Sequence, residues 1–333
     1  MEKTKVAVIG LGGIAQLVHL PNIAKLNSVD VIAVAEVNKN RLSAIADKFK
    51  IKERFTDYKE LLAKSDVEAV IIATPTGTHK EIALAAIKAK KHILVEKPFT
   101  RTYLEAKPIV EAAKRNNCKI MVGLNLRYRP DAMLLKTLIN AGEIGEPNYV
   151  KAGWIRRQSS DGKWFTRKTE SGGGVIIDLG ILLLDLCMWL MNYPPVDRVS
   201  TQSFNTKTKN VEDTSVSFIR CKNSSLINLE TSWSLALEKD TFYLTVFGSK
   251  GSASINPIKI FKNIEDKIIE LNPPKEESPM VLFRKSYLNE LKSFIGAVRG
   301  LHPVMSSGEE ALIRMKVIES MYKSSKLNAE VKV

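Results

Sequence analysis

The sequence predicts an α/β fold with two domains, and three observations support this prediction. A continuous apolar run, residues 6–9, leads into a glycine-rich turn and then into apolar residues at helical spacing. Strands and helices alternate over residues 1–123, as expected for a doubly wound parallel sheet. Over residues 124–333 most strands follow one another without helices between them, which predicts an α+β domain with a large, mostly antiparallel sheet.

The glycine-rich turn is typical of a dinucleotide-binding unit. Gly10, Gly12 and Gly13 follow the first strand. Ile14 and Ala15 then begin a helix. Glycines at such a turn let the backbone approach a pyrophosphate, whose negative charge is favourable at a helix N-terminus. Strand, turn and helix together predict the first half of a Rossmann βαβ unit, with the glycines and Ile14 around the pyrophosphate.

The second predicted strand, residues 30–36, ends in an acid. Glu36 lies about 20 residues after Ala15, where dinucleotide-binding folds place a carboxylate that accepts hydrogen bonds from the adenosine ribose. A carboxylate there repels a 2′-phosphate, so the sequence favours NAD over NADP as the cofactor. The competing interpretation is a glycine-rich turn followed by an unrelated surface acid.

The composition is that of a globular protein. Hydrophobic residues make up 44% and charged residues 26% of the 333 positions, and the chain is long enough for two hydrophobic cores. The first strand begins almost at the N-terminus, and no apolar run suggests a membrane span, so we expect neither a signal peptide nor a membrane partner. The three cysteines have no metal-ligand spacing, which predicts reduced thiols, no metal and a cytoplasmic location.

The formal net charge of +14 raises the question of nucleic-acid binding. The lysines are scattered, however, and a run such as residues 88–91 lies at a predicted helix end, where cations favour the helix dipole. We therefore expect a solvated lysine-rich surface and no nucleic-acid partner. A preference for anionic substrates, such as sugar phosphates or nucleotide sugars, is the lesser alternative.

The remaining elements follow from hydrophobic period and capping signals. In the first domain we expect helices at 39–49, from Asp57, from Thr78 and at 103–116, and strands at 54–55, 67–73, 92–95 and 119–122. In the second domain we expect helices at 132–140, 283–299 and 307–324, and strands at 147–156, 196–204, 214–221, 224–233, 242–247 and 251–255. Two helices carry the signature of a capping box, Thr78 with Glu81 and Ser307 with Glu310.

Polar turns follow the fourth, fifth and sixth strands, at residues 74–79, 96–98 and 123–127. Ligands of parallel sheets bind beyond the carboxyl ends of the strands, so we expect these turns to border one crevice. Their motifs are Ala73-Thr-Pro75 with His79, Glu96-Lys-Pro98 and Gly123-Leu-Asn125, after Gly10-Leu-Gly-Gly-Ile-Ala15 at the first strand.

The order and spacing of these motifs resemble the glucose-fructose oxidoreductase, inositol dehydrogenase and rhizopine catabolism (Gfo/Idh/MocA) family. The likeness covers nearly the whole chain, and Glu-Lys-Pro is its most specific mark. It implies that Thr74, Pro75 and His79 lie near the cofactor and that Glu96 and Asn125 are further contacts. His79 by itself is better explained as a first-turn helix residue than as a catalytic one. The resemblance also implies a homodimer or homotetramer formed through the second domain's sheet.

Lys97 follows the apolar fifth strand, where a nicotinamide would lie. The oxidised nicotinamide is cationic, and a like charge with partial burial lowers the pKa of a lysine. A lysine in that position can take the proton of a substrate hydroxyl as hydride leaves for the ring. The competing interpretation is an exposed lysine paired with Glu96. The resemblance implies that Lys97 is a catalytic and substrate-binding residue.

The second domain departs from the family at one position. Glycines at 172–174 open a predicted helix that carries Asp178, Leu182 and Asp185. The family has an Asp, a His four residues later and a second Asp three further on, so Leu182 stands at the His position. In many members this His helps to move the hydroxyl proton, and leucine cannot carry one. Asp178 is a candidate catalytic residue or a helix-start carboxylate, and Asp185 is expected to be structural.

Three outcomes follow from the leucine. Lys97, coupled to Asp178, does the acid–base chemistry alone. A neighbouring group such as Tyr128, or a group of the substrate, replaces the His. Or the protein binds nucleotide and ligand without turnover.

The predicted substrate pocket combines Lys97 and Asp178 with aromatic and arginine side chains. Aromatic rings stack on sugar faces, and an arginine holds a carboxylate or phosphate with two hydrogen bonds. The competing interpretation is ordinary packing of an edge strand and a loop. The candidates are Arg127, Trp154, Arg157 and Trp164.

The sequence thus predicts an NAD-dependent oxidoreductase acting on a secondary hydroxyl or ketone of a sugar, cyclitol or related compound. Two alternatives stay open: a nucleotide-binding protein without turnover, and a redox-neutral lyase or hydrolase that uses NAD transiently.

Overall fold

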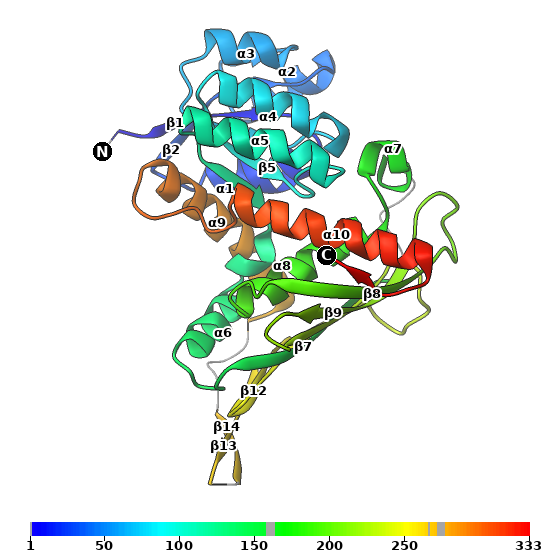
Figure 1. Cartoon of the computed structure of the whole chain (residues 1–333). Helices are drawn as coiled ribbons and strands as arrows, with labels where there is room; N and C mark the ends of the chain where they lie inside the picture. Colours follow the sequence, from blue (N-terminus) through cyan, green and yellow to red (C-terminus); the bar gives the residue numbers. More distant parts are fainter. Residues whose placement is uncertain (1, 158–163, 266, 272–276) are drawn as a thin grey trace. The chain divides into compact units, whose positions relative to one another are not determined.

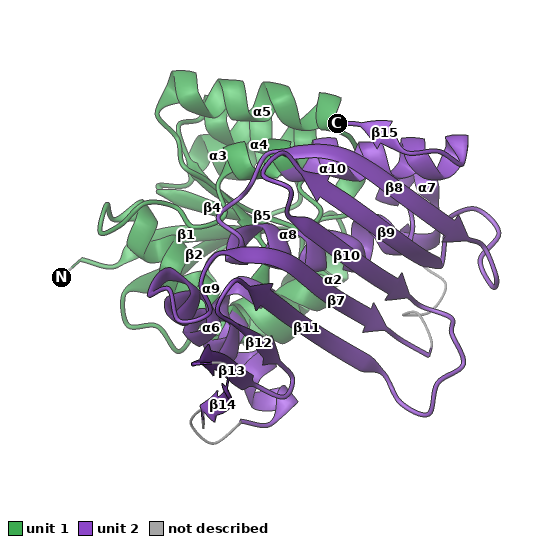
Figure 2. Cartoon of the chain, turned by 60° about the horizontal axis from the view of Figure 1, so that its bottom comes forward, with its two compact units in different colours: residues 1–125, 287–313 green, residues 126–286, 314–333 purple. Residues whose placement is uncertain are grey.

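The fold was analysed in a computed structural model that describes residues 2–157, 164–265, 267–271 and 277–333. The chain forms two compact units, which Figure 2 shows in different colours. Unit 1 contains residues 1–125 and 287–313, and unit 2 contains residues 126–286 and 314–333. The sequence predicts one domain at residues 1–123 and another at 124–333. In the structure the chain returns to unit 1 at residues 287–313, which that prediction did not include.

Unit 1 is built on a parallel six-stranded sheet with the order β3-β2-β1-β4-β5-β6, which confirms the predicted doubly wound sheet (Figure 1). All four residues of β4 are buried, which explains its continuous apolar sequence. The strand order reverses beside β1, the point at which such sheets bind ligands. The strands are β1 (Thr4–Ile9), β2 (Val29–Ala35), β3 (Glu53–Phe55), β4 (Ala69–Ile72), β5 (His92–Glu96) and β6 (Ile120–Gly123).

The helices of unit 1 connect these strands, and α3, α4 and α5 lie side by side (Figure 1). The first connection begins with a π-helical turn, η1, and the fourth with a 3₁₀ turn, η2. The elements are η1 (Ala15–His19), α1 (Leu20–Ile23), α2 (Lys39–Lys48), α3 (Tyr58–Lys64), η2 (Thr76–Thr78), α4 (His79–Lys88) and α5 (Tyr103–Asn116). A 3₁₀ turn, η3 (Asn125–Tyr128), follows β6.

The returning segment covers the edge of the sheet at β6. The Val122 N–H donates to the carbonyl of Ser306 at 2.9 Å, and Met121 forms an antiparallel bridge with Ser307. The segment runs from the end of α9 (Pro279–Val298) into the start of α10 (Gly308–Leu327). An edge strand with unpaired backbone groups is thereby partnered within the chain.

Unit 2 contains a nine-stranded sheet, and its mostly antiparallel pairing confirms the prediction. Among the described residues its pairs are antiparallel except β7 with β10, which is parallel. The order is β14-β13-β12-β11-β7-β10-β9-β8-β15. The strands are β7 (Pro147–Ile155), β8 (Val196–Phe204), β9 (Thr214–Cys221), β10 (Leu226–Ser232), β11 (Thr241–Gly248), β12 (Gly251–Ile255), β13 (Lys259–Ile264), β14 (Lys267–Leu271) and β15 (Val331–Lys332).

Helix α8 is the core helix of unit 2, and all ten of its residues are buried. The helical elements outside the sheet are α6 (Pro130–Asn140), η4 (Trp164–Thr166), α7 (Lys168–Ser171), η5 (Ile176–Gly180) and α8 (Ile181–Leu190). The helical stretch Lys168–Leu190 is long and apolar enough to cross a membrane, contrary to the sequence-based expectation. Its most apolar window is 89% buried within the structure, however, as in a core helix of a globular domain, so this is weak evidence for a span.

The sequence analysis missed three strands and misassigned one cap. Charged and polar residues interrupt the apolar residues of β13 (Lys-Ile-Phe-Lys-Asn-Ile) and β14 (Lys-Ile-Ile-Glu-Leu), and β15 has only two residues, so none of the three strands has a clear sequence pattern. The predicted capping box at Thr78 is wrong, because the Thr78 hydroxyl donates to the Pro75 carbonyl and Glu81 accepts from the Tyr58 hydroxyl. At Ser307 the predicted cap is present, since its hydroxyl accepts from the Glu310 N–H at 3.2 Å.

Candidate active site

Gly10 turns the chain out of β1 close to the turn that follows β4. Its φ of +88° lies in the left-handed region, and a Cβ there would lie 2.8 Å from the Ala73 carbonyl oxygen. Gly12 and Gly13 differ, because a Cβ on either would meet nothing within 4 Å. The protein's own packing therefore demands glycine at position 10 but not at 12 and 13, where the open space suits a ligand.

Glu36 directly follows β2, and its buried carboxylate lies against the glycine turn. One oxygen accepts from the Leu11 N–H at 3.0 Å, and the other accepts from the Asn38 N–H at 2.9 Å. The Arg41 guanidinium lies 3.4 Å from the first oxygen. Strand β2 thus places a negative charge at the turn, as the sequence spacing predicts.

His79 links the turns that follow β4 and β5. It is 1% exposed; Nε2 lies 2.8 Å from the Thr74 carbonyl oxygen and Nδ1 lies 3.0 Å from that of Pro98. Burial lowers the pKa of His79, although its hydrogen bonds to backbone carbonyls act in the opposite direction. Both ring nitrogens face the backbone, so His79 does not fit the predicted role of a direct cofactor contact. Thr74 is half-buried and Pro75 exposed at the same turn.

The end of β5 carries the Glu-Lys-Pro motif. One oxygen of the Glu96 carboxylate lies 2.6 Å from His19 Nε2, and the other accepts from the Lys97 N–H at 3.2 Å. Lys97 is half-buried, and its peptide bond to Pro98 is cis. His19 is a residue that sequence reasoning missed; a single polar residue between Val18 and Leu20 was the available signal. Asn125, at the end of β6, is buried.

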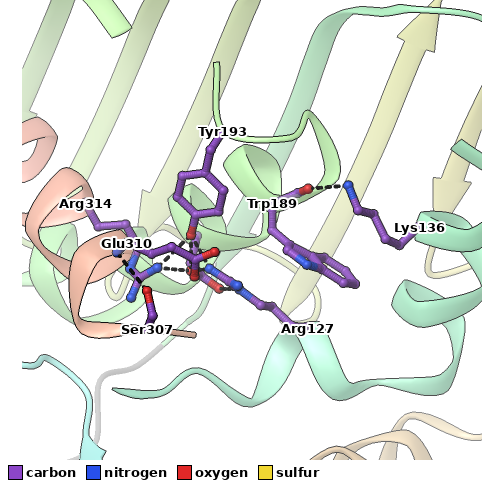
Figure 3. Close-up of polar contacts among 8 residues, drawn as sticks. Arg127, Lys136, Trp189, Tyr193, Ser307, Glu310 and Arg314 are labelled. Carbon is purple, nitrogen blue, oxygen red and sulfur yellow. Dashed lines mark hydrogen bonds and ion pairs between the residues drawn. The ribbon is translucent and has the colours of Figure 1, made fainter. Parts of the chain in front are cut away.

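Arg127 does not fit the predicted role of a substrate contact. Its side chain is 0% exposed and donates from Nε and Nη2 to the two oxygens of Asp185, at 2.7 and 2.5 Å (Figure 3). Arg314 donates to the same carboxylate at 2.8 Å and to the Tyr193 hydroxyl at 2.6 Å. Asp185 therefore holds two buried arginines, which agrees with its expected structural role.

Lys136 caps the C-terminal end of α8. Its ammonium donates to the Trp189 carbonyl at 2.7 Å (Figure 3). It also donates to the Asn192 side chain at 2.5 Å. Burial, and then the charge of Arg127, lower its pKa to about 8. Arg127 and Lys136 thus both have acceptors within unit 2.

Asp178 lies in the π-helical turn η5 and is half-buried. The indole N–H of Trp233 donates to its Oδ2 at 3.2 Å. Trp233 is buried in an apolar cluster with Val175, Leu179 and Val211, against which Trp154 packs. Trp233 is thus a second residue that sequence reasoning missed, because its proximity to Asp178 arises only from the fold.

The glycines before η5 are explained by close packing within the protein. A Cβ on Gly174 would lie 1.9 Å from the Glu212 carbonyl oxygen, and one on Gly173 would lie 1.9 Å from the Tyr322 hydroxyl. The Glu212 carboxylate accepts from the Gly174 and Ile176 N–H groups at 2.9 and 3.0 Å, and burial raises its pKa. Glu212 therefore anchors the backbone that leads to Asp178.

The other predicted substrate residues lie in unit 2, in separate local contacts. Trp154 packs edge-on against Phe242. Arg157 is exposed and donates to the Glu238 carbonyl at 3.1 Å. Trp164 stacks on Phe165 with ring centroids 4.0 Å apart. Residues 161–163, whose sequence Asp-Gly-Lys predicts a turn, lie outside the described residues.

Leu182, at the position of the family's His, is 4% exposed. Within the described parts of the chain no group of three or more His, Cys, Asp or Glu side chains could hold a metal ion. The cysteines are free thiols; Cys187 and Cys221 are buried and Cys118 is half-buried.

The glycine turn after β1, the Glu36 carboxylate and the Glu-Lys-Pro turn after β5 define a nicotinamide-dinucleotide-binding oxidoreductase. The family model for the oxidoreductase family, NAD-binding Rossmann fold, matches residues 4–124, and that for its C-terminal alpha/beta domain matches residues 136–333. The chain therefore belongs to the Gfo/Idh/MocA oxidoreductase family, which confirms the resemblance, and like its named relatives it is a dehydrogenase.

Two curated relatives span the whole chain. D-glucoside 3-dehydrogenase of Escherichia coli K12 is 25% identical over 99% of this chain and 97% of its own. Myo-inositol 2-dehydrogenase of Thermotoga maritima is 26% identical over 99% and 98%. Levoglucosan dehydrogenase, solved in complex with NADH and L-sorbose, has the same fold, with a TM-score of 0.90, 21% identity and coverage of 100% and 99%.

Proposed function

We propose that this protein is an NAD-dependent dehydrogenase that acts on a CH–OH group of a sugar, cyclitol or related compound, or reduces the corresponding ketone. The observation that carries the proposal is the half-buried Lys97 at the carboxyl end of β5, in a turn held by Glu96 and linked by His79 to the turn after β4. The named sugar and inositol dehydrogenases among the relatives support the substrate class.

The cofactor fits the first half of the site. The open space over Gly12 and Gly13 suits a pyrophosphate, and the Glu36 carboxylate would accept hydrogen bonds from the ribose. Its negative charge favours NAD over NADP. Thr74, Pro75 and Asn125 are the proposed further contacts.

Bound NAD supplies the hydride acceptor. In the oxidation the Lys97 amine takes the proton of the substrate hydroxyl. Asp178, whose Oδ2 accepts from the Trp233 N–H, is the proposed residue that orients Lys97 or the substrate. We further propose that Trp154, Arg157 and Trp164 contribute to substrate binding, and we leave Arg127 out because Asp185 occupies it.

The sheet of unit 2 is the proposed contact with further copies of the chain. Phe218 and Phe247 are 45% and 38% exposed, and the strand pairing puts them on one face with Tyr149, which stacks on Phe247. Exposed aromatic side chains on one sheet face are typical of a subunit interface. We propose a cytoplasmic homodimer or homotetramer that binds neither nucleic acid nor a membrane.

Leu182 supports a second candidate function. A buried leucine cannot move a proton. In this second candidate no other group replaces the His, and the chain is a redox-neutral lyase or hydrolase that uses NAD transiently, or a nucleotide-binding protein without turnover. Tightly bound NAD without net reduction would favour this candidate.

The deciding experiment follows the reduced-nicotinamide absorbance while protein and NAD are mixed with sugars, cyclitols, sugar phosphates and nucleotide sugars. Growth of the band with one compound class supports the dehydrogenase and names its substrates. Lys97→Met should then abolish the signal, whereas Lys80→Met, an exposed lysine of α4, should not change it. Calorimetrically confirmed NAD binding without absorbance growth would favour the second candidate.

A further inference from the structure

His19 is a fully buried imidazole on the first helical turn after the nucleotide-binding glycines. It is 0% exposed, and its Nε2 lies 2.6 Å from Glu96 Oε1. Among the described residues its Nδ1 has no hydrogen-bond partner. Burying an imidazole is costly unless a partner compensates. The partner of Nε2 is Glu96, the first residue of the Glu-Lys-Pro motif.

The Glu96 carboxylate has two polar partners and lies next to Gly123. His19 lies at Oε1, and the Lys97 N–H donates to Oε2 at 3.2 Å. Gly123 pairs with Glu96 across the β5–β6 ladder, and a Cβ on Gly123 would lie 3.4 Å from Glu96 Cδ and Oε1. Position 123 therefore lies in van der Waals range of the Glu96 carboxylate.

The π-helical turn η1 directs His19 toward Glu96. One residue inserted into a helix with 3.6 residues per turn rotates every later side chain by about 100°. η1 ends at His19, so the insertion decides which way this side chain points. Without it the imidazole would be turned by about 100° from its direction toward Glu96.

We propose that His19 is a positioning residue of the active site: it fixes the Glu96 carboxylate, which in turn fixes the backbone N–H of Lys97. This inference rests on the proposed function of Lys97. It assigns to the nucleotide-binding helix a second role, in which the element that receives the pyrophosphate also sets the place of the acid–base lysine.

The test uses His19→Leu and His19→Gln in the full-length protein, with His302→Leu, a change on an exposed loop, as the control. We expect His19→Leu to lower kcat by about 10²-fold, because small misplacements of a catalytic group have effects of this size. The dissociation constant for NAD should stay within about threefold, because glycine turn and Glu36 are unchanged. His19→Gln keeps a side-chain N–H donor and should recover part of kcat.

A readout without turnover separates this inference from the proposed function. Lysines are reductively methylated with ¹³C, and the Lys97 resonance is identified by its loss in Lys97→Arg. We expect this resonance to shift in His19→Leu and to return toward its wild-type position in His19→Gln. An unchanged resonance overturns the positioning role, as does a wild-type kcat. If the wild type oxidises no compound, the Lys97 resonance alone decides whether His19 has a positioning role. If His19→Leu does not fold, the resonance is compared between the wild type, His19→Gln and Glu96→Gln.

Discussion

Two π-helical turns present polar side chains in this protein, η1 in unit 1 and η5 in unit 2. Each follows a glycine-rich stretch and leads into an α-helix. The glycines before η1 at positions 12 and 13 face open space, whereas Gly173 and Gly174 before η5 are packed against Tyr322 and Glu212. Two similar glycine clusters therefore have different physical reasons: the first leaves room for a ligand, and the second lets the protein pack on itself.

The two turns also differ in what their side chains can reach. His19 is enclosed and bonded to Glu96, so it can act only through a neighbour. Asp178 accepts from the Trp233 indole N–H and is only half-buried, so part of its side chain is accessible to a ligand. We infer that the π-helical turn of unit 1 serves positioning and that of unit 2 serves contact with the substrate.

The largest effect should separate Asp185 from Asp178, the two acids of the helical stretch Lys168–Leu190. Asp185→Ala leaves Arg127 and Arg314 without their buried carboxylate, and we expect a loss of about 3–5 kcal/mol in the free energy of unfolding. Asp178→Asn keeps an oxygen for the Trp233 N–H, so it should change stability little and lower kcat. Urea unfolding and steady-state kinetics measure both. Equal stability losses would contradict the division between a structural and a functional acid.

The next largest effects should come from alanine substitutions in the two glycine clusters. Gly174→Ala forces a methyl group against the Glu212 carbonyl, and we expect a loss of about 1–3 kcal/mol in the free energy of unfolding. Gly13→Ala meets no protein atom and lies in a helical position, so stability should be kept while NAD binding weakens at least about tenfold. Urea unfolding and calorimetry provide the two numbers. Normal NAD binding by Gly13→Ala would show that the open space is not the pyrophosphate site.

Glu36 tests whether the ligand of the first turn is NAD. Glu36→Gln removes the negative charge, and the nearby Arg41 guanidinium then faces a 2′-phosphate without competition. We expect the ratio of NADP to NAD affinity to rise by about tenfold or more, since 1.4 kcal/mol corresponds to a factor of ten. The double variant with Arg41→Gln is the control and should lose most of this gain. An unchanged ratio in Glu36→Gln would place the ribose elsewhere.

Trp233→Phe should have the smallest effect. It keeps the aromatic packing and removes the N–H that holds Asp178, which we expect to cost about 1 kcal/mol of stability and to lower kcat about fivefold. Thermal unfolding and steady-state kinetics check both values, with Trp189→Phe, a buried tryptophan of the same unit, as the matched control. A normal kcat in Trp233→Phe would mean that Asp178 does not depend on this bond.

Sequence reasoning reached the fold class, the family and most element boundaries. β8, β9 and β12 match their predicted ranges because their apolar and polar residues alternate. β13 and β14 were missed because lysines break up their apolar pattern, although their backbones pair in register. The Thr78 cap failed because the hydroxyl has a nearer acceptor in the Pro75 carbonyl.

By itself the sequence determined what local order carries: the glycine turn, the acid at the end of β2, the Glu-Lys-Pro motif and the missing His at Leu182. Only the tertiary structure decided which side chains meet. Arg127 and Asp185 are 58 residues apart, Asp178 and Trp233 55, and His19 and Glu96 77, and no local period records such pairs. The physical reason is that a buried charge or N–H group takes the partner that the packing of the elements brings near it, and the distance along the chain does not enter that choice.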